Sequence, residues 1–232
     1  MQYLCSTVFF SLYILLCIRI SRICAFDILN VPGNITSTVS SNNFVVVGDE
    51  INSKIFVYKK SNDIVIWELI SILHEGLGPS SKYGHSIDID DVFIVVGAPG
   101  EQKVYLYEIN VDNDQFELIR VFYPPISYLD GGFGNDVSID NNRIAIAHPG
   151  KKVFTHYNLG CVELYYNLGY EWSRVQSLIP SDYTDDIFFG DSVQLRGDKV
   201  ITSSSIQGRA YVFGFNTYTE SWNEIKLSLI HI

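Results

Sequence analysis

The stretch Tyr83-Gly84-His85-Ser86-Ile87-Asp88-Ile89 returns twice further along the chain. It reappears as Phe133-Gly134-Asn135-Asp136-Val137-Ser138-Ile139 and as Phe189-Gly190-Asp191-Ser192-Val193-Gln194-Leu195, with starts 50 and 56 residues apart. A repeat in this range indicates a stacked or circular array of small sheets, in which each unit covers an apolar face of its neighbour. The repeat therefore predicts the architecture before any single residue predicts a function.

Three further apolar stretches follow each copy of this phrase in the same order. After the first copy they cover 92–99, 104–107 and 116–119, and the last of them begins at an aromatic residue. Short runs rich in Val, Ile, Tyr and Phe, bounded by Gly, Asn, Asp and Pro, are typical of strands. Residues that tolerate a positive φ separate the first stretch from the second, as in Asn141-Asn142 and Gly197-Asp198, and they suit two-residue hairpins.

A more divergent copy of the repeat precedes these three. Its second, third and fourth stretches are 44–48, 55–58 and 67–70, whereas Asn34-Ile35-Thr36-Ser37 stands in place of the opening phrase and resembles it little. The chain is therefore predicted to be all-β, with four strands in each of four repeats. The repeats run over about 30–82, 83–132, 133–188 and 189–232.

Four short antiparallel strands per repeat predict the blades of a β-propeller. We favour a compact ring of four blades, because the first and last blades of an open array would show apolar faces to water. The alternative is a partial propeller. Its open blade faces would then support self-association or assembly with another partner chain.

The repeat also resembles a known motif. Each copy opens on an aromatic-Gly pair, and the first continues to a hydrophobic run that ends in Gly97-Ala98-Pro99. The later copies read Ala147-His148-Pro149 and Ser203-Ser204-Ser205 at that place. Over about residues 30–230 this pattern resembles the FG-GAP repeat, which builds the N-terminal β-propeller of integrin α chains. The resemblance implies a secreted or surface-exposed module for recognition, as in cell adhesion, which binds a protein or glycan ligand without catalysis.

Two departures limit this resemblance. Integrin-type propellers have seven blades, whereas this chain has room for about four. Several family members also bind calcium in a carboxylate-rich loop between the first and second strands, which needs several oxygen ligands around one turn. Here those turns are short, and we expect Asp88, Asp90 and Asp91 to be solvated turn residues. We therefore predict no metal ion and no cofactor.

The N-terminus differs from the repeats. Residues 1–18 carry no charge, and Arg19 and Arg22 precede Ile23-Cys24-Ala25. We predict a signal peptide over 1–25, preceding a propeller domain over 26–232, and a secreted, extracellular protein. The alternative is an uncleaved signal anchor formed by residues 1–20, which would be the only route to a membrane.

Net charge, cysteine content and one sequon further limit the kinds of partner and of covalent modification that we expect. The formal net charge of −10 argues against nucleic acid and against anionic membranes, because both attract basic proteins. Cys161 is the only cysteine after residue 25, so we expect a buried thiol and no internal disulfide. Asn34-Ile35-Thr36 is the one N-x-Ser/Thr sequon, so Asn34 is the predicted glycosylation site of a glycoprotein.

One connection is unusually long. In the third repeat, residues 149–159 join the second strand to the third, where the earlier repeats have short turns. Long irregular loops are more often functional than short ones. The predicted ligand-binding residues of this loop are Lys151, Lys152, Phe154, His156 and Tyr157. The inter-blade loops expected on the same side add Tyr128, Asp130, Asp182 and Tyr183, which can hydrogen-bond and stack against a sugar or a peptide.

Alternatives stay open at this site. The long loop could be a drifted insertion with Phe154 tucked into the core. His148 and His156 fix no metal geometry, so we expect two solvated side chains. A glycan-processing enzyme would need carboxylates that converge at the centre of the disc, and no catalytic motif can be defended from spacing. We therefore expect no enzymatic activity.

Overall fold

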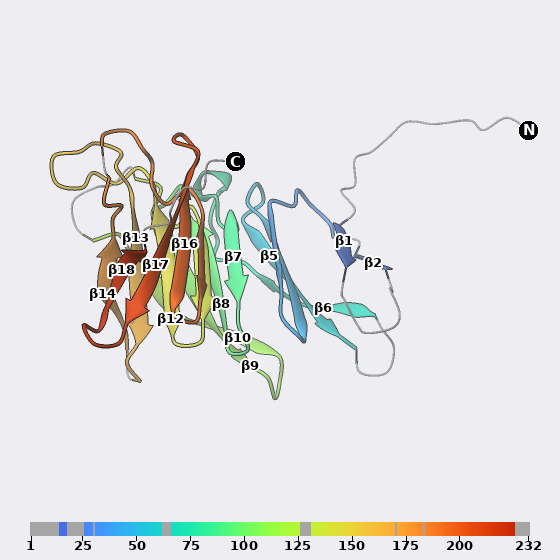
Figure 1. Cartoon of the computed structure of the whole chain (residues 1–232). Coiled ribbons are helices and arrows are strands. Elements are labelled where there is room, and N and C mark those ends of the chain that lie inside the picture. Colours follow the sequence, from blue (N-terminus) through green and yellow to red (C-terminus); the bar gives the residue numbers. More distant parts are fainter. Residues whose placement is uncertain are drawn as a thin grey trace, which may run out of the picture.

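Four four-stranded antiparallel sheets make up the protein in the computed structural model (Figure 1). The structure describes residues 14–17, 26–29, 31–61, 66–125, 131–169, 171–182 and 184–225, the first two ranges by their backbone. Each sheet is a meander whose strands follow one another in space as in sequence. We call the sheets blades 1 to 4. The predicted all-β propeller of four-stranded blades is therefore confirmed.

The strands match the predicted repeats. Blade 1 holds β3 (Ser37–Ser40), β4 (Phe44–Asp49), β5 (Lys54–Lys60) and β6 (Trp67–Leu73). Blade 2 holds β7 (Ser86–Ile89), β8 (Phe93–Ala98), β9 (Lys103–Asn110) and β10 (Gln115–Phe122). Blade 3 holds β11 (Val137–Asp140), β12 (Arg143–His148), β13 (Cys161–Asn167) and β14 (Trp172–Leu178). Blade 4 holds β15 (Val193–Arg196), β16 (Lys199–Ser204), β17 (Arg209–Asn216) and β18 (Ser221–Ile225).

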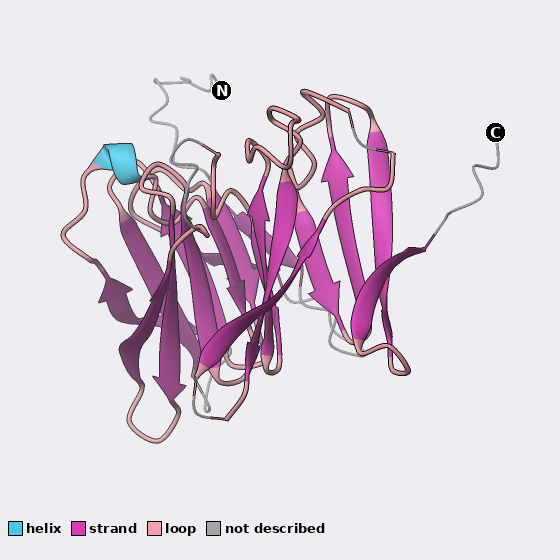
Figure 2. Cartoon of the chain, turned by 90° about the vertical axis from the view of Figure 1, so that its left-hand side faces the viewer, coloured by secondary structure: helices cyan, strands magenta, loops and turns pink. Residues whose placement is uncertain are grey.

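Two short elements lie outside the blades. β1 (Ile14–Cys17) pairs antiparallel with β2 (Phe26–Leu29), and the 3₁₀ turn η1 (Pro79–Ser81) precedes blade 2 (Figure 2). Most of the predicted signal segment 1–25 lies outside the described residues, so it stays a prediction. Among the described residues, no helix has the length and apolar character needed to cross a bilayer.

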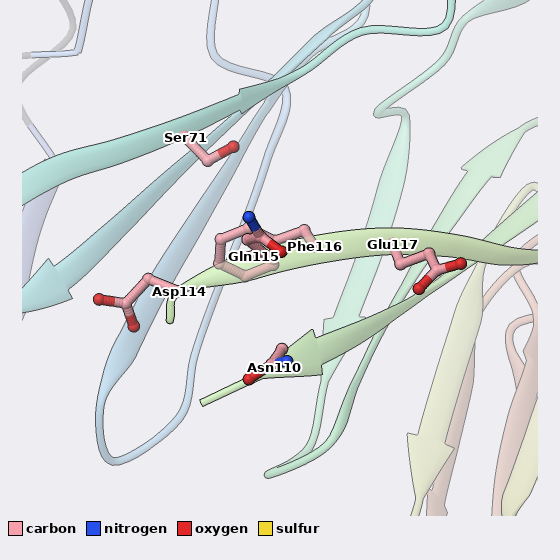
Figure 3. A pocket seen from close by; sticks show the side chains of 6 residues that line it. All are labelled: Ser71, Asn110, Asp114, Gln115, Phe116 and Glu117. Atoms are coloured by element: carbon pink, nitrogen blue, oxygen red, sulfur yellow. The ribbon is translucent and has the colours of Figure 1, made fainter. Parts of the chain in front are cut away.

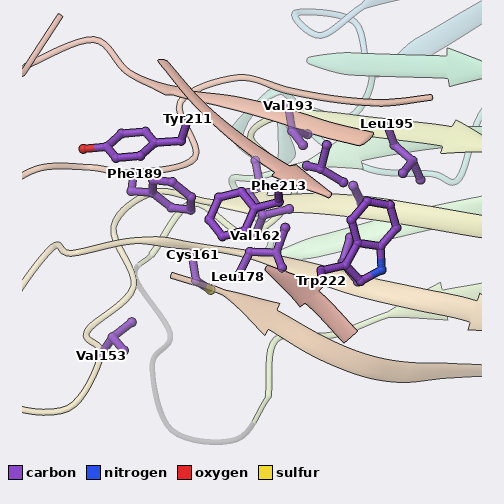
Figure 4. Close-up of a cluster of buried hydrophobic side chains, with 14 of the residues drawn as sticks. Val153, Cys161, Val162, Leu178, Phe189, Val193, Leu195, Tyr211, Phe213 and Trp222 are labelled. Atoms are coloured by element: carbon purple, nitrogen blue, oxygen red, sulfur yellow. The ribbon is translucent and has the colours of Figure 1, made fainter. Parts of the chain in front are cut away.

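The aromatic residue of each repeated phrase is a core residue. Tyr83, Phe133 and Phe189 are fully buried between consecutive blades. Tyr83 packs edge-on against Tyr105 at 5.2 Å, and Phe189 packs against Tyr211 at 5.1 Å between ring centroids. Figure 4 shows the cluster between blades 3 and 4, where the rings of Tyr211, Phe213 and Trp222 lie against aliphatic side chains of blade 3 such as Val162 and Leu178. Such edge-to-face pairs add about 0.5–1.5 kcal/mol each to the burial of apolar area.

The first strand of each blade is a sheet edge, and its outward N–H groups have no strand partner. The neighbouring blades supply acceptors instead. Asp88 accepts the N–H of Ile89 in its own strand and the N–H of Ile139 in blade 3, both at 2.9 Å. Asp136 accepts the N–H of Val137 at 3.0 Å and that of Val193 in blade 4 at 2.7 Å. The expectation that Asp88 is a solvated turn residue was therefore wrong, because this side chain is buried as a link between blades.

The repeated glycines allow the same blades to approach closely. Gly134 has a φ of +85°, which favours glycine, and its carbonyl oxygen accepts the Ser86 hydroxyl of blade 2 at 3.1 Å. A Cβ at Gly97 would lie 2.2 Å from that oxygen and 2.2 Å from the hydroxyl. Gly48 meets Gly84 in the same way one blade earlier. The Phe-Gly and Gly-Ala-Pro parts of the repeat are thus two sides of one contact.

The outer faces of the first and last blades differ in how well their apolar side chains are covered. On the outer face of blade 1, Val47 and Phe56 are buried together with Val31, which follows β2; Figure 1 shows β1 and β2 on this side. On the outer face of blade 4, Ile201 and Ile225 are 48% and 40% exposed. In the described part of the chain, the first strands pack in the order β3, β7, β11 and β15, with no comparable packing of β15 against β3. The one longer reach is from Arg196 of β15 to Asp88 of β7, at 3.4 Å. The expected compact ring is therefore not what these residues form, because the four blades make an open arc.

Gly97→Ala tests the contact between blades 2 and 3. The added methyl group would collide with a backbone carbonyl that cannot move alone, so we expect a loss of about 1–3 kcal/mol in the free energy of unfolding. Urea denaturation measures it. Gly78→Ala is the matched control, because Gly78 has an ordinary φ of −85° and open space around the added atom. An equal effect of the two substitutions would contradict the proposed contact.

Candidate functional site

The long loop of blade 3 is a folded unit. Val153 and His156 exchange both backbone hydrogen bonds, at 3.1 and 3.0 Å, which leaves Phe154 and Thr155 at the tip. At the base of the loop, the N–H of Gly160 donates to the carbonyl of Lys151 at 2.9 Å. The loop therefore projects from β12 and β13 as a small hairpin with a closed neck.

The segment that leads into blade 4 supports this hairpin. The N–H groups of Asp186, Phe188 and Phe189 donate to the carbonyls of residues 157, 158 and 159, each at 2.9 Å. Gly160 and Phe189 form a parallel bridge. The inserted residues thus gain backbone partners that a drifted loop would lack.

Three of the predicted ligand residues form a group at the outer end of the loop, with both aromatic residues exposed and Lys152 half-buried. Phe154 and Tyr157 are 71% and 61% exposed, so the alternative that Phe154 is tucked into the core was wrong. The Nζ atom of Lys152 lies 4.0 Å from the centroid of the Tyr157 ring, a cation–π contact. We call Lys152, Phe154 and Tyr157 the aromatic tip. His156 lies beside it, with Nδ1 2.9 Å from Oδ1 of Asp185.

The other predicted residues are placed differently. Lys151 turns inward, and its Nζ lies 2.5 Å from Oε1 of Glu163, with the lysine side chain 13% exposed. Asp182 forms an ion pair with Arg209 of blade 4. Asn34 is exposed, as glycosylation requires. Tyr128, Asp130 and Tyr183 lie outside the described residues.

Lys151 turns inward because Glu163 is fully buried on β13 and needs a counter-ion. Glu163 also accepts hydrogen bonds from the Ser177 hydroxyl at 2.6 Å, from the Cys161 thiol at 3.3 Å and from Arg174 at 3.3 Å. Burial alone would raise the pKa of Glu163, but Lys151 and the hydroxyl and thiol donors hold that pKa below its usual value. The carboxylate is thus ionised and fixes the start of the long loop.

His148 is the residue that sequence reasoning misplaced. We expected a solvated side chain, but the ring is fully buried, and it packs edge-on against Phe133 at 5.5 Å. Neither ring nitrogen has a hydrogen-bond partner. Burial, helped by the positive charge of Lys151, lowers the pKa of His148 to about 4. Its register position was a usable signal, because it replaces the buried Ala98 of blade 2.

A concave feature lies at the other end of the blades, away from the aromatic tip. A hollow of about 450 Å³ opens between β6 and the turn that joins β9 to β10 (Figure 3). It is lined by Ser71, Asn110, Asp114, Gln115, Phe116 and Glu117. Asp114 is already paired with Lys59 at 2.6 Å. The hollow offers acids that are partly satisfied within the protein, so the aromatic tip is the stronger candidate.

No metal centre is built from the described residues, since no three of their His, Cys, Asp or Glu side chains are placed to hold an ion. The carboxylates nearest the arc's inner edge, Asp88 and Asp136, are used in linking the blades. What the tip can offer chemically is a flat apolar surface next to one ammonium group.

Comparison with known proteins supports the fold. The computationally designed Ika4 protein matches with a TM-score of 0.51 at 16% identity, over 79% of this chain and 92% of that one. Two putative 6-phosphogluconolactonases, from Bacteroides uniformis and Bacteroides fragilis, match with TM-scores of 0.61 at 12% and 9% identity, over 82% and 88% of this chain. The chain spans 53% and 61% of their length. Neither a family model nor a curated protein matches this chain.

His148→Ala tests the burial of the neutral imidazole. The folded-state pKa lies below that of the unfolded chain, so this stabilising effect is present above about pH 6.5 and is lost as the pH falls to about 4. The stability advantage of the wild type over the variant should shrink by about 3 kcal/mol across that window. Urea denaturation at each pH measures it. His74→Ala, at an exposed histidine, is the control, and parallel pH profiles for wild type and His148→Ala would contradict the assignment.

Proposed function

We propose that this chain is a non-catalytic recognition module that binds a protein or glycan ligand through the aromatic tip. The observation that carries the proposal is the exposure of Phe154 and Tyr157, at 71% and 61%, on a loop whose backbone is held by blade 4. Large aromatic side chains displayed on a rigid support are typical of binding surfaces, because they contribute contact area at low entropic cost.

The chemistry of the tip indicates the kind of ligand group it suits. A ring face packs against the apolar face of a sugar or against an apolar side chain. Lys152, already placed over Tyr157, adds a positive charge on a chain of net charge −10. A ligand that presents an apolar surface beside a carboxylate or sulfate group would match both features.

We further propose that the repeats are divergent FG-GAP repeats and that the protein is secreted. The contact of Gly97 with Gly134 supports the first proposal, since it gives both halves of the motif a physical role. The apolar stretch before Arg19 and the exposed sequon at Asn34 support the second. The alternative, a glycan-processing enzyme, has no comparable support in the described carboxylates.

The tip is tested by the double substitution Phe154→Ala and Tyr157→Ala. A glycan array and a cell-surface protein screen with the wild type first identify a ligand and its class. We then expect the double variant to bind that ligand at least about tenfold more weakly, because central aromatic residues cost about 2 kcal/mol or more when truncated. Tyr218→Ala is the matched control, since Tyr218 is an exposed aromatic residue in the turn between β17 and β18. If the double variant binds the ligand as tightly as the wild type does, the aromatic tip is not the binding site.

A second function has support at the end of the arc. Ile201, Val212 and Ile225 are cross-strand neighbours on the outer face of blade 4, the face that a following blade covers in blades 2 and 3. We propose that this face mediates self-association, because neighbouring exposed apolar residues favour contact with a similar surface.

Sedimentation equilibrium of the purified chain tests this assembly. Ile201→Lys should convert an associated form into a monomer, because burying the new charge would oppose the contact. Ile51→Lys, at an exposed residue in the turn after β4, should leave the association unchanged. A wild type that sediments as a monomer at every concentration would end the proposal.

A further inference from the structure

The two ends of the long loop bring an amine and a thiol together. Lys151 begins the hairpin and Cys161 follows its last residue. Oε1 of Glu163 lies 2.5 Å from the Lys151 Nζ atom and 3.3 Å from the Cys161 Sγ atom. One carboxylate oxygen therefore holds the two groups at the neck of the loop.

This pair is closed to large reactants. Cys161 and Glu163 are fully buried, and only 13% of the Lys151 side chain is exposed. Burial raises the pKa of Cys161, so its sulfur carries a proton at neutral pH. A thiol in this position cannot reach the cysteine of another protein. Its chemistry is limited to its immediate neighbours and to reactants as small as dioxygen.

A second observation points to the same place. His148 is the cross-strand partner of Cys161 in the pairing of β12 with β13. Its ring is fully buried, and neither nitrogen has a partner. An unpaired polar group in a core lowers the stability of the fold, so each such group calls for an explanation, such as a role in chemistry.

We propose that Lys151 and Cys161 form a covalent modification site, in which dioxygen joins the Nζ atom to the Sγ atom through one bridging oxygen. The neighbouring groups fit this reaction. The shared oxygen of Glu163 lies within reach of both nitrogen and sulfur, and the unpaired imidazole of His148 occupies the cross-strand position opposite Cys161. Without the bridge, the same groups form the ion pair described above.

The reaction balances with one dioxygen molecule. The amine, the thiol and dioxygen give the N–O–S bridge and one water. The S–H bond, one N–H bond and the O=O bond break, while an N–O bond, an O–S bond and the two O–H bonds of water form. Nitrogen and sulfur lose two electrons each, and dioxygen takes up all four. Because Lys151 starts as an ammonium group, its extra proton passes first to Glu163.

The bridge would act on the candidate ligand site. It would close the chain from 151 to 161 into a covalent ring that contains the aromatic tip. Such a link restricts the conformations of the loop, and a rigid loop loses less entropy when it binds. This consequence rests on the proposed function, whereas the bridge itself does not.

Mass spectrometry of the wild-type protein tests the bridge directly. Protein exposed to air should be heavier than freshly reduced protein by about 14 Da, the mass of one oxygen less two hydrogens, and dithiothreitol should reverse the gain. Proteolysis should give a peptide that joins Lys151 to Cys161. An unchanged mass with a free thiol would overturn the proposal, and so would a gain of about 16 or 32 Da, which marks oxidation of sulfur alone.

Variants separate this proposal from the proposed function. Cys161→Ser and Lys151→Arg should each abolish the gain in mass, and Lys151→Arg keeps a positive charge for Glu163. Lys152→Arg is the matched control and should keep the gain. If no bridge forms while the ligand still binds, this inference fails alone. If the bridge forms in a protein whose aromatic tip binds nothing, the proposed function fails alone.

Discussion

The open edge of each first strand is the constraint on which this fold depends. A meander of four strands pairs every strand on both sides except the first and the last, so the first strand presents unpaired N–H groups to its neighbours. Leaving such groups buried and unpaired costs about 1–3 kcal/mol each. Asp88 and Asp136 solve this with two oxygens, one for an N–H of their own strand and one for the next blade. The same bonds that complete one sheet therefore place the following sheet.

This constraint explains why the fold could be predicted from the sequence. The repeated phrase is the contact between blades, so its aromatic ring, its glycine and its small polar residues recur wherever a blade meets another. Phe133 fills the space between blades, and Gly134 turns the chain so that its carbonyl reaches Ser86. Closure could not be predicted in this way. It depends on the angle between consecutive blades, which the four repeats share and no single residue specifies.

The candidate site was predicted only in part, for a different reason. The choice of Phe154 and Tyr157 as ligand-binding residues followed from the length of the loop, and the structure then showed both to be exposed. The inward turn of Lys151 depends on a residue of the next strand. Glu163 interrupts an otherwise apolar stretch, and a buried carboxylate requires a cation nearby. That signal was present in the sequence, but the register that brings Lys151 to it required the structure.

Blade 4 differs from blades 2 and 3 in the side chains that link one blade to the next. Asp136, just before β11, and Ser138 and Asp140 of β11 accept the N–H groups of Val193, Leu195 and Gly197, so that every second residue makes a link. The matching positions in blade 4 are Ser192, just before β15, and Gln194 and Arg196 of β15, and Arg196 donates back to the carbonyl of Ile139. Blade 4 therefore lacks the carboxylates with which blades 2 and 3 hold the blade that follows each of them. What its outer face offers a partner is the apolar row of Ile201, Val212 and Ile225, so this face favours association driven by apolar contact.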